Sequence, residues 1–358
     1  MKFSRLLIVL LAIATCAACG GSRSAKDFSH DETNSVYFWK TVFDPDSVDY
    51  QILKDHEVGR VYLRMFDVDV NDGADRGVYK TAPVGTLKIP DEAYSEYRKR
   101  LGATAFVPVV YITLDALEES NGNEGQLAQN IVERVKNMCS FNDVPNVEGL
   151  QLDCDWTEST EPSFFALCDS VRYFLNKSGL DWNLSSTIRL HQLARQAPPV
   201  DYGVLMVYNT GNFNDPDEEN SIITRENVEP YLRYLREYPL HLDVAYPTYS
   251  WQLLFRNRRF VGLLNGLDLQ DTAMFARRSP NQYIVLKDFS YNNKSIFEGD
   301  IIKLEISDYD EIIEIKKLIE TRLEGRPHSN ILYHLDSRNL SKYSNDELNN
   351  IFAVDKAN

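Results

Sequence analysis

Strand-like and helix-like segments alternate along the chain from residue 35 onward, and this alternation is the strongest constraint on the fold. Segments rich in β-branched and aromatic residues are followed by segments with apolar residues at helical spacing, as at Leu127, Ile131 and Val135. Alternation of this kind is typical of α/β proteins with a parallel sheet. Strands are expected at Ser35–Phe43, Arg60–Val68, Ala103–Thr113, within Val147–Glu158, and at Trp182–Ile188, Gly203–Tyr208, His241–Tyr246 and Asn330–Leu335.

Eight strands with intervening helices predict a (β/α)8 TIM barrel, and a chain of 358 residues suits one such barrel with insertions. An open doubly wound sheet is the alternative, but it would need a glycine-rich phosphate loop, and the sequence has none. Barrel residues are expected at 35–355, with a small insertion at 252–306 after strand 7 that contains a hairpin near Tyr291–Asn293. Helices are expected at Val48–His56, Asp91–Leu101, Gly125–Cys139, Pro162–Lys177, Glu226–Tyr238, Asp308–Leu323 and Asn345–Phe352.

The fourth strand carries an unusual polar face. In Val147–Glu158, side chains alternate, so Gln151, Asp153 and Asp155 share one face while the intervening residues are apolar. A strand of a parallel barrel is normally apolar on both faces. Burying carboxylates without a partner or a task is costly, so this face is expected to look into a site. The alternative is structural: the carboxylates could pair with Arg64, Arg189 or backbone, or hold a metal ion.

Composition excludes some partners. The formal net charge of −15 argues against nucleic acid, because phosphate binding needs clustered lysine and arginine. No cofactor motif is present, and the spacing of Cys139, Cys154 and Cys168 matches no metal site. Three cysteines cannot all pair, so at least one free thiol is expected.

The first residues predict export. A basic start and an apolar run from Leu6 to Ala18, too short to span a membrane, are typical of a signal peptide. Cys16-Ala-Ala-Cys19 resembles a bacterial lipobox, and Cys19 is the better lipidation candidate. We therefore expect a signal peptide at residues 1–18, a polar tether at 19–34 and anchoring through the N-terminal lipid, as a bacterial lipoprotein of the outer membrane or facing the periplasm. An ordinary secretory signal is the alternative.

The strand-4 stretch resembles the signature of the chitinase and endo-β-N-acetylglucosaminidase family, glycoside hydrolase family eighteen. That signature reads Asp-Gly-x-Asp-x-Asp-x-Glu. Here Glu148 and Gly149 stand at its opening Asp-Gly, and Gln151 stands at the second Asp. Asp153 keeps the third Asp, and Asp155 stands at the catalytic Glu. The proton donor is thus a shorter residue, and one carboxylate is an amide.

Strand 6 is similar to the same family. Met206-Val207-Tyr208-Asn209 matches its Met-x-Tyr-Asp, with Asn at the last position, and the insertion after strand 7 lies where the family carries a small α+β insert. Two features of the family are missing: the Ser-x-Gly-Gly of strand 3 and the Trp of strand 8 that floors the sugar subsite.

The resemblance implies a mechanism in which the N-acetyl oxygen of the substrate is the nucleophile, so that one enzyme acid suffices. That acid must be protonated near neutral pH, which a neighbouring like charge or a dry pocket can achieve. By resemblance Asp155 is the acid, Asp153 shares its proton and orients the N-acetyl group, and Tyr208 donates a hydrogen bond to it.

Other side chains near strand ends are candidate glycan contacts. Arg189 and His191 follow strand 5 and could bind a hydroxyl or a carboxylate, and Asp67 ends strand 2, where it could instead pair with Arg64. Aromatic faces stack on sugar C–H surfaces, although core packing is an equal alternative for each ring. The remaining candidates are Gln151, Met206, Asn209, Trp39, Tyr111, Trp156, Tyr246 and Trp251.

These observations favour a glycoside hydrolase-like exported lipoprotein acting on a glycan, with N-acetylhexosamine linkages as the preferred target. A catalytically silent glycan-binding lipoprotein is the alternative from another class. The retained Asp153 and Asp155 with Tyr208 favour the enzyme. The missing Glu, the missing Ser-x-Gly-Gly and the missing strand-8 Trp favour the binding protein.

Overall fold

The structure is a computed structural model that describes residues 32–71 and 80–354. Within these residues, eight parallel strands close into a barrel, because β1 pairs with both β2 and β16. The predicted (β/α)8 barrel is confirmed. Its strands are β1 (Ser35–Phe38), β2 (Arg60–Val70), β4 (Ala105–Ile112), β5 (Gly149–Asp153), β6 (Asn183–Arg189), β7 (Tyr202–Met206), β8 (Leu242–Pro247) and β16 (Asn330–Tyr333).

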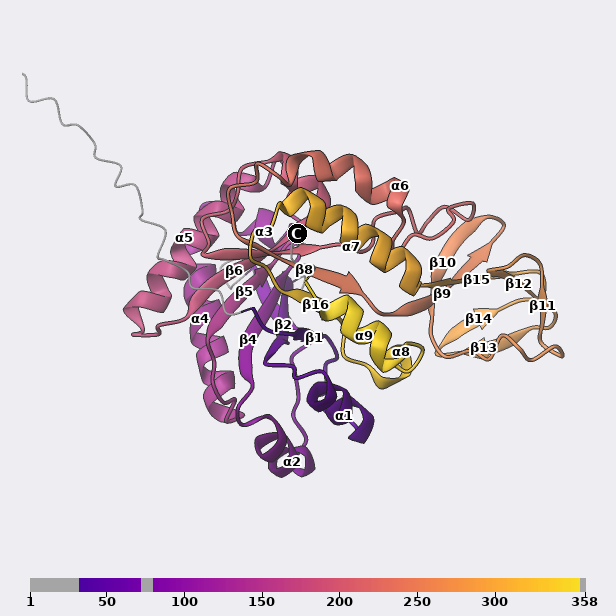
Figure 1. The fold of residues 1–358 in the computed structure, drawn as a ribbon, viewed down its shortest axis with the longest axis horizontal. Coiled ribbons are helices and arrows are strands. Elements are labelled where there is room, and N and C mark those ends of the chain that lie inside the picture. The colour runs from indigo at the N-terminus through magenta and orange to yellow at the C-terminus, as the bar shows by residue number, and fades with distance from the viewer. Residues whose placement is uncertain (1–31, 72–79, 355–358) are drawn as a thin grey trace, which may run out of the picture.

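Helices lie outside the strands and cover them (Figure 1). In α4, Leu127, Ile131 and Val135 are buried, as their helical spacing predicts, and they join the main apolar core. The α-helices are α1 (Ser47–Asp55), α2 (Asp91–Leu101), α3 (Leu114–Glu119), α4 (Glu124–Phe141), α5 (Glu161–Lys177), α6 (Arg225–Val228), α7 (Tyr309–Leu323), α8 (Ser337–Leu340) and α9 (Asn345–Phe352), and two 3₁₀ helices are η1 (Leu190–Ala194) and η2 (Glu229–Tyr234).

The inside of the barrel is filled with polar as well as apolar side chains. The Tyr37 hydroxyl donates to Gln151 Oε1 at 2.6 Å, and Gln151 Nε2 donates to Ser185 Oγ at 3.4 Å. All three side chains are fully buried. Buried amides and hydroxyls are tolerated when they hydrogen-bond to one another, so this layer forms a packed floor beneath the carboxyl ends of the strands.

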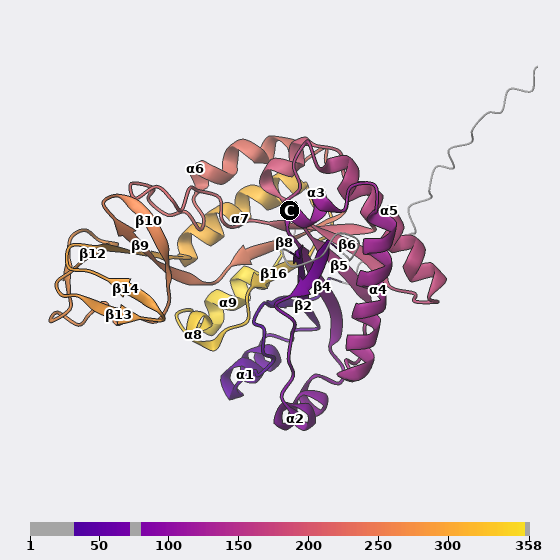
Figure 2. The same ribbon diagram turned by 180° about the vertical axis from the view of Figure 1, so that it is seen from behind.

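A small insertion follows β8, the seventh strand of the barrel, as predicted. Its five-stranded antiparallel sheet has the order β10-β9-β15-β12-β11, and Figures 1 and 2 show it projecting from one side of the barrel. The expected hairpin is β13–β14, whose turn residues Asn292 and Asn293 have φ of 48° and 61°, a conformation that asparagine tolerates. The strands are β9 (Ser250–Arg256), β10 (Arg259–Leu264), β11 (Phe275–Arg277), β12 (Gln282–Val285), β13 (Phe289–Tyr291), β14 (Lys294–Ile296) and β15 (Ile301–Ile306).

Two local predictions were wrong. The helix expected at Glu226–Tyr238 is one turn of α6 followed by η2, because Pro230 lacks an N–H group and restricts the residue before it. The first strand ends at Phe38 rather than Phe43. One strand was not predicted: β3 (Thr81–Val84), which pairs antiparallel with the end of β2.

The predicted signal peptide, Cys19 and most of the predicted tether lie outside the described residues. Among the residues that are described, no helix is both long and apolar enough to cross a bilayer. Cys139, Cys154 and Cys168 are all free and buried, and burial raises the pKa of each thiol. Thiols of this kind are unreactive packing groups.

Candidate functional site

Strand register determines which side chains meet at the carboxyl end of β5. Asp153 pairs with Tyr111 of β4 across the parallel ladder, and Gln151 pairs with Ser185 of β6. Two residues further along both strands, Thr187 comes level with Asp153. The pleat therefore points Asp153 into the barrel between two polar neighbours, and it turns Asp155, two residues later, toward the same side.

Asp153 is a buried carboxylate with fixed partners. It accepts a hydrogen bond from Thr187 Oγ1 at 2.6 Å and from Arg189 Nη2 at 2.9 Å, and its side chain is 2% exposed. Burial raises the pKa of Asp153, while Arg189 and Thr187 oppose that shift and Asp155 adds to it. Burial disfavours a charged guanidinium at Arg189, but the nearby Asp153, Tyr208 and Asp155 together raise its pKa. The two groups form a buried ion pair.

Asp155 lies in a different environment. Its side chain is 53% exposed, and its Oδ1 lies 3.5 Å from His191 Nε2. Together with Tyr111, Arg189 and Met206, these two residues line a cavity of about 290 Å³. Asp155 therefore faces an open space large enough for part of a ligand, and water also reaches it.

Tyr208 lies where two cavities meet. Tyr208 and Asn209 line both the 290 Å³ cavity and a second cavity of about 690 Å³. Burial raises the pKa of the Tyr208 phenol, so its hydroxyl stays protonated and can donate a hydrogen bond. Asn209 has φ of 54°, and its Oδ1 accepts a hydrogen bond from the Tyr249 hydroxyl at 2.6 Å. We call the two joined cavities the cleft.

The larger cavity has an aromatic wall. Tyr333, the last residue of β16, stacks on Tyr208 with ring centroids 4.3 Å apart. Trp39 meets Tyr333 at 5.7 Å, and Trp251 meets Tyr249 edge-on at 5.5 Å. These five rings come from the carboxyl ends of β1, β7, β8 and β16 and from β9, which is where a barrel places its ligand site.

A charged cluster closes the far end of the larger cavity. Asp336 Oδ2 lies 3.0 Å from Lys40 Nζ and 3.3 Å from Arg338 Nη2. Burial acts to raise the pKa of Asp336, but hydrogen bonds from these two cations outweigh it and hold the pKa at about 2. Asp46 and Asp49 also act on Lys40 electrostatically, so the cluster as a whole carries no excess positive charge.

Comparison with known proteins finds similarity in structure alone: no family model and no curated protein matches the sequence. A chitinase from Chromobacterium violaceum superposes with a TM-score of 0.52 at 14% identity, covering 90% of this chain and 98% of that one. The Bacillus cereus spore cortex-lytic enzyme SleL gives 0.53 at 13% identity, over 91% and 76%. The GH18 chitinase ChiB of Flavobacterium johnsoniae gives 0.52 at 10%, over 90% and 94%.

This chain has a divergent chitinase-like TIM barrel fold. Each of the three superpositions covers about nine-tenths of the chain. At identities this low, structural similarity shows the fold alone. Function must be argued from the site of the chitinase-like barrel itself.

The chitinase-like barrel brings most of the predicted site residues together. Those that line the cleft are Asp155, Tyr208, Arg189, His191, Met206, Asn209, Tyr111, Trp39 and Trp251. Asp153 lies directly beneath them and reaches the cleft only through Arg189. The roles of these residues in binding or catalysis remain predictions.

Four predicted contacts lie away from the cleft. Trp156 is fully buried against Phe164 in the helix layer, because it directly follows Asp155 and side chains alternate. Tyr246 is fully buried in the same outer core for the same reason, one residue after an inward-facing Ala245. Gln151 is part of the barrel floor, and Asp67 forms an ion pair with Arg64. None of the four lines either cavity of the cleft.

Sequence reasoning missed Tyr333 as a site residue. The expected strand 8 was judged by its lack of Trp, although Tyr333 is an aromatic residue near the carboxyl end of that strand. Tyr333 packs on Tyr208, Trp39 and Tyr249 and lines the cavity. An aromatic residue at a strand end, rather than Trp alone, would have been the right signal.

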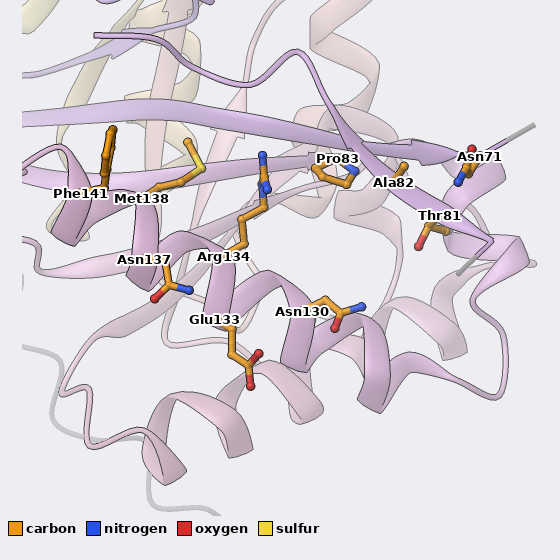
Figure 3. A pocket seen from close by; sticks show the side chains of 10 residues that line it. All are labelled: Asn71, Thr81, Ala82, Pro83, Asn130, Glu133, Arg134, Asn137, Met138 and Phe141. Carbon is orange, nitrogen blue, oxygen red and sulfur yellow. The ribbon is translucent and has the colours of Figure 1, made fainter. Parts of the chain in front are cut away.

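Another cavity, of about 770 Å³, lies on the outer side of the barrel along α4 and β3. Figure 3 shows its lining, with Arg134 extending from α4 toward the strands, where it donates to Thr86 Oγ1 at 3.0 Å. None of the predicted site residues lines it. Across residues 32–71 and 80–354, no group of three metal-ligating side chains converges on one point.

Proposed function

We propose that this protein binds a glycan in the cleft at the carboxyl end of its barrel. The observation that carries this proposal is the aromatic wall formed by Trp39, Tyr208, Tyr249, Trp251 and Tyr333 around a cavity of about 690 Å³. Sugar rings present C–H surfaces that pack on aromatic faces, and their hydroxyls need a few polar partners. Asn209, Asn265 and Asn339 line the same cavity and supply amides for those hydroxyls.

The preferred ligand contains N-acetylhexosamine. Support comes from the motif resemblance on β5 and β7 and from the similar structures, two of which are chitinases. The phenol of Tyr208, kept protonated by burial, offers a donor for an acetamido oxygen at the junction of the two cavities.

The geometry favours binding over hydrolysis by the mechanism that the resemblance implies. In that mechanism Asp153 would share a proton with Asp155. Here the carboxylate of Asp153 hydrogen-bonds to Thr187 and pairs with Arg189, and it is almost fully buried. Asp155 is half exposed next to His191, so water reaches the carboxylate that the resemblance assigns as the acid.

The proposal is tested by titrating N-acetylglucosamine oligomers of two to six sugars into the wild-type protein in a calorimeter. A saturable signal that strengthens with oligomer length is expected, because the two joined cavities can hold more than one sugar. The absence of binding at millimolar oligomer, for both N-acetylglucosamine and muramic-acid-containing oligomers, would contradict it.

Hydrolysis is the second candidate function. Asp155 favours it, because this carboxylate lines the 290 Å³ cavity and stands where the motif resemblance places the acid. Prolonged incubation of oligomer with wild type, followed by mass spectrometry of the products, tests it. Cleavage that disappears in Asp155→Asn would establish the hydrolase with Asp155 as its acid, whereas cleavage that persists in this variant would exclude Asp155.

We also propose that the mature chain is a lipoprotein anchored through Cys19, based on the basic start, the short apolar run and the lipobox-like Cys16-Ala-Ala-Cys19. In a bacterial host, Cys19→Ser is expected to move the protein from the detergent phase to a soluble exported fraction. Mass spectrometry of the mature N-terminus distinguishes Cys19 from Cys16, and unmodified cysteines at both positions would contradict the anchor.

A further inference from the structure

Trp251 forms the part of the cleft wall that belongs to the insertion. It is the second residue of β9, and its ring meets Tyr249 at 5.5 Å and Phe213 at 6.2 Å, both edge-on. Packing against these rings limits how far the indole can turn. A hydrogen bond from the indole N–H, the one hydrogen-bonding group on the ring, adds a directional contact.

That contact is supplied by Glu305 of β15. Glu305 Oε2 accepts from Trp251 Nε1 at 2.7 Å, and the Glu305 side chain is fully buried. The same oxygen accepts from the backbone N of Ser221 at 3.1 Å and from Ser221 Oγ at 2.5 Å. One carboxylate oxygen therefore joins the cleft wall to the loop that follows β7.

A buried cation balances this carboxylate. Lys303 Nζ lies 2.7 Å from Glu305 Oε1, and the Lys303 side chain is 1% exposed. Lys303 also donates to the backbone carbonyl of Glu218, in the same loop as Ser221. A buried ion pair costs desolvation energy, which the attraction between the two charges and the hydrogen bonds to Glu305 Oε2 must offset. Removing one partner alone would leave a buried charge unpaired.

We infer that Glu305 is a positioning residue that fixes the indole of Trp251 against the loop after β7 and so prepares the cleft wall for a sugar. This inference rests on the proposed glycan-binding function. A preformed wall lowers the entropy lost on binding, because the indole need not be ordered by the ligand. Glu305 is buried and does not touch the ligand, so its effect must pass through Trp251.

The test uses two matched double variants. Lys303→Met with Glu305→Gln removes both charges and keeps a neutral acceptor for the indole. Lys303→Met with Glu305→Met also removes both charges at similar volume but leaves no acceptor. Neither leaves a buried unpaired charge, and the two differ in the acceptor at position 305, which serves both Trp251 and Ser221. Circular dichroism and thermal melting confirm that both fold.

Calorimetric titration with an N-acetylglucosamine oligomer is expected to show about five- to tenfold weaker binding for the variant without an acceptor. In a Trp251→Phe background, which has no indole N–H, the two double variants are expected to bind equally. Equal affinity in the Trp251 background would overturn the inference. A loss that persists in the Trp251→Phe background would also overturn it, because Glu305 would then act by another route.

A ligand-free measurement separates this inference from the proposed function. The indole N–H resonance of Trp251, assigned by its disappearance in Trp251→Phe, reports the hydrogen bond directly. It is expected to differ between the two double variants, with the acceptor-free variant shifted upfield. If wild type binds no oligomer, the proposed function fails, and this resonance alone decides whether Glu305 positions Trp251: an unchanged resonance overturns the inference.

Discussion

The two cavities that meet at Tyr208 differ in which groups line them and in how those groups are held. On one side, a 290 Å³ cavity is lined by Asp155, His191 and Arg189. On the other side, a 690 Å³ cavity is walled by aromatic rings that come from four barrel strands and the insertion. The candidate acid Asp155 lines the smaller cavity, and surface for packing against a sugar is concentrated in the larger one.

The comparison shows that the two requirements of a glycosidase, a surface that binds sugar and a general acid, are met to different extents. The larger cavity has what sugar binding needs: rings fixed by their neighbours and amides among them. In the smaller cavity the resemblance assigns Asp155 as the acid, but this carboxylate is half exposed, and Asp153 beneath it is held by Arg189. Water therefore reaches the group that a hydrolase would use as its general acid.

The largest expected effect comes from the ion pair beneath the smaller cavity. Arg189→Met leaves Asp153 buried without its counter-charge, so the free energy of unfolding is expected to fall by about 3–5 kcal/mol at neutral pH. Burial already raises the pKa of Asp153. Stability that depends on the protonated form of Asp153 is present at low pH and is lost as the pH rises. The loss in free energy of unfolding caused by Arg189→Met should therefore become smaller as the pH falls.

Urea unfolding of wild type and Arg189→Met between pH 4 and 8 measures this effect. The matched control is Arg258→Met, which removes the cation of an exposed pair with Asp217 and should leave the free energy of unfolding nearly unchanged. A deficit in Arg189→Met no larger than the control would contradict the view that Asp153 depends on Arg189.

The next effect concerns the larger cavity. Trp39→Ala removes a ring that contacts Tyr333 and lines the cavity, so affinity for an N-acetylglucosamine oligomer is expected to drop about tenfold to a hundredfold. Phe141→Ala is the matched control, because this aromatic side chain is 84% exposed and lies on α4 at the other cavity. Calorimetry should show unchanged affinity for the control; an equal loss in both variants would contradict the placement of the glycan.

A smaller effect is expected at the charged end of the larger cavity. Asp336→Asn keeps the acceptor that caps α8 but removes the carboxylate that pairs with Lys40 and Arg338. The pKa of Asp336 is lowered to about 2. The stabilising contribution of its carboxylate is therefore present above about pH 4 and is lost as the pH falls from about 4 through the folded-state pKa of about 2. The variant should lose about 1–2 kcal/mol at pH 7.

Thermal unfolding of Asp336→Asn at several pH values checks this prediction. The difference from wild type should disappear between about pH 4 and pH 2, since both proteins then carry an uncharged group at this position. A difference that stays constant across this range would show that the carboxylate charge is not what stabilises the cluster.

The smallest effect is expected for Asp155→Asn. The side chain is half exposed and its Oδ1 lies 3.5 Å from His191 Nε2. The free energy of unfolding should therefore stay nearly unchanged, and glycan affinity should change by no more than about twofold. If wild type cleaves the oligomer, the same variant should lower kcat by about two to four orders of magnitude. Isothermal titration and product analysis on one preparation therefore separate the two functions.

The fold could be predicted from the sequence because the periodicities are strong. The apolar spacing of Leu127, Ile131 and Val135 permits a helix and little else, and the alternation of such helices with strands leaves few topologies. The prediction failed at Glu226–Tyr238, where apolar spacing continues past Pro230 but the backbone cannot remain α-helical. Strand β3 has no apolar run of its own and forms only by pairing with β2.

The candidate site could be predicted in part. Asp155, Arg189, His191 and Tyr208 were found because they follow barrel strands, where ligand sites lie. Trp156 and Tyr246 were assigned by residue type alone, and strict alternation from Asp155 and Ala245 would have placed both rings in the outer core.

The sequence could name the partners of these side chains only as alternatives. Whether Asp153 pairs with Arg189 or with Asp155 depends on side-chain geometry between neighbouring strands, and Glu305 and Trp251 lie more than fifty residues apart in sequence. Contacts of this kind follow from the closed barrel and the docking of the insertion, and no local pattern encodes them.

The central claim is that the cleft binds a glycan through its aromatic side. Calorimetric titration of an N-acetylglucosamine oligomer into wild type, Trp39→Ala and Asp155→Asn, with product analysis of each sample, tests it most directly. We expect saturable binding by wild type and Asp155→Asn, a loss of about tenfold or more in Trp39→Ala, and intact oligomer throughout. Binding that survives in Trp39→Ala and fails in Asp155→Asn would contradict the account.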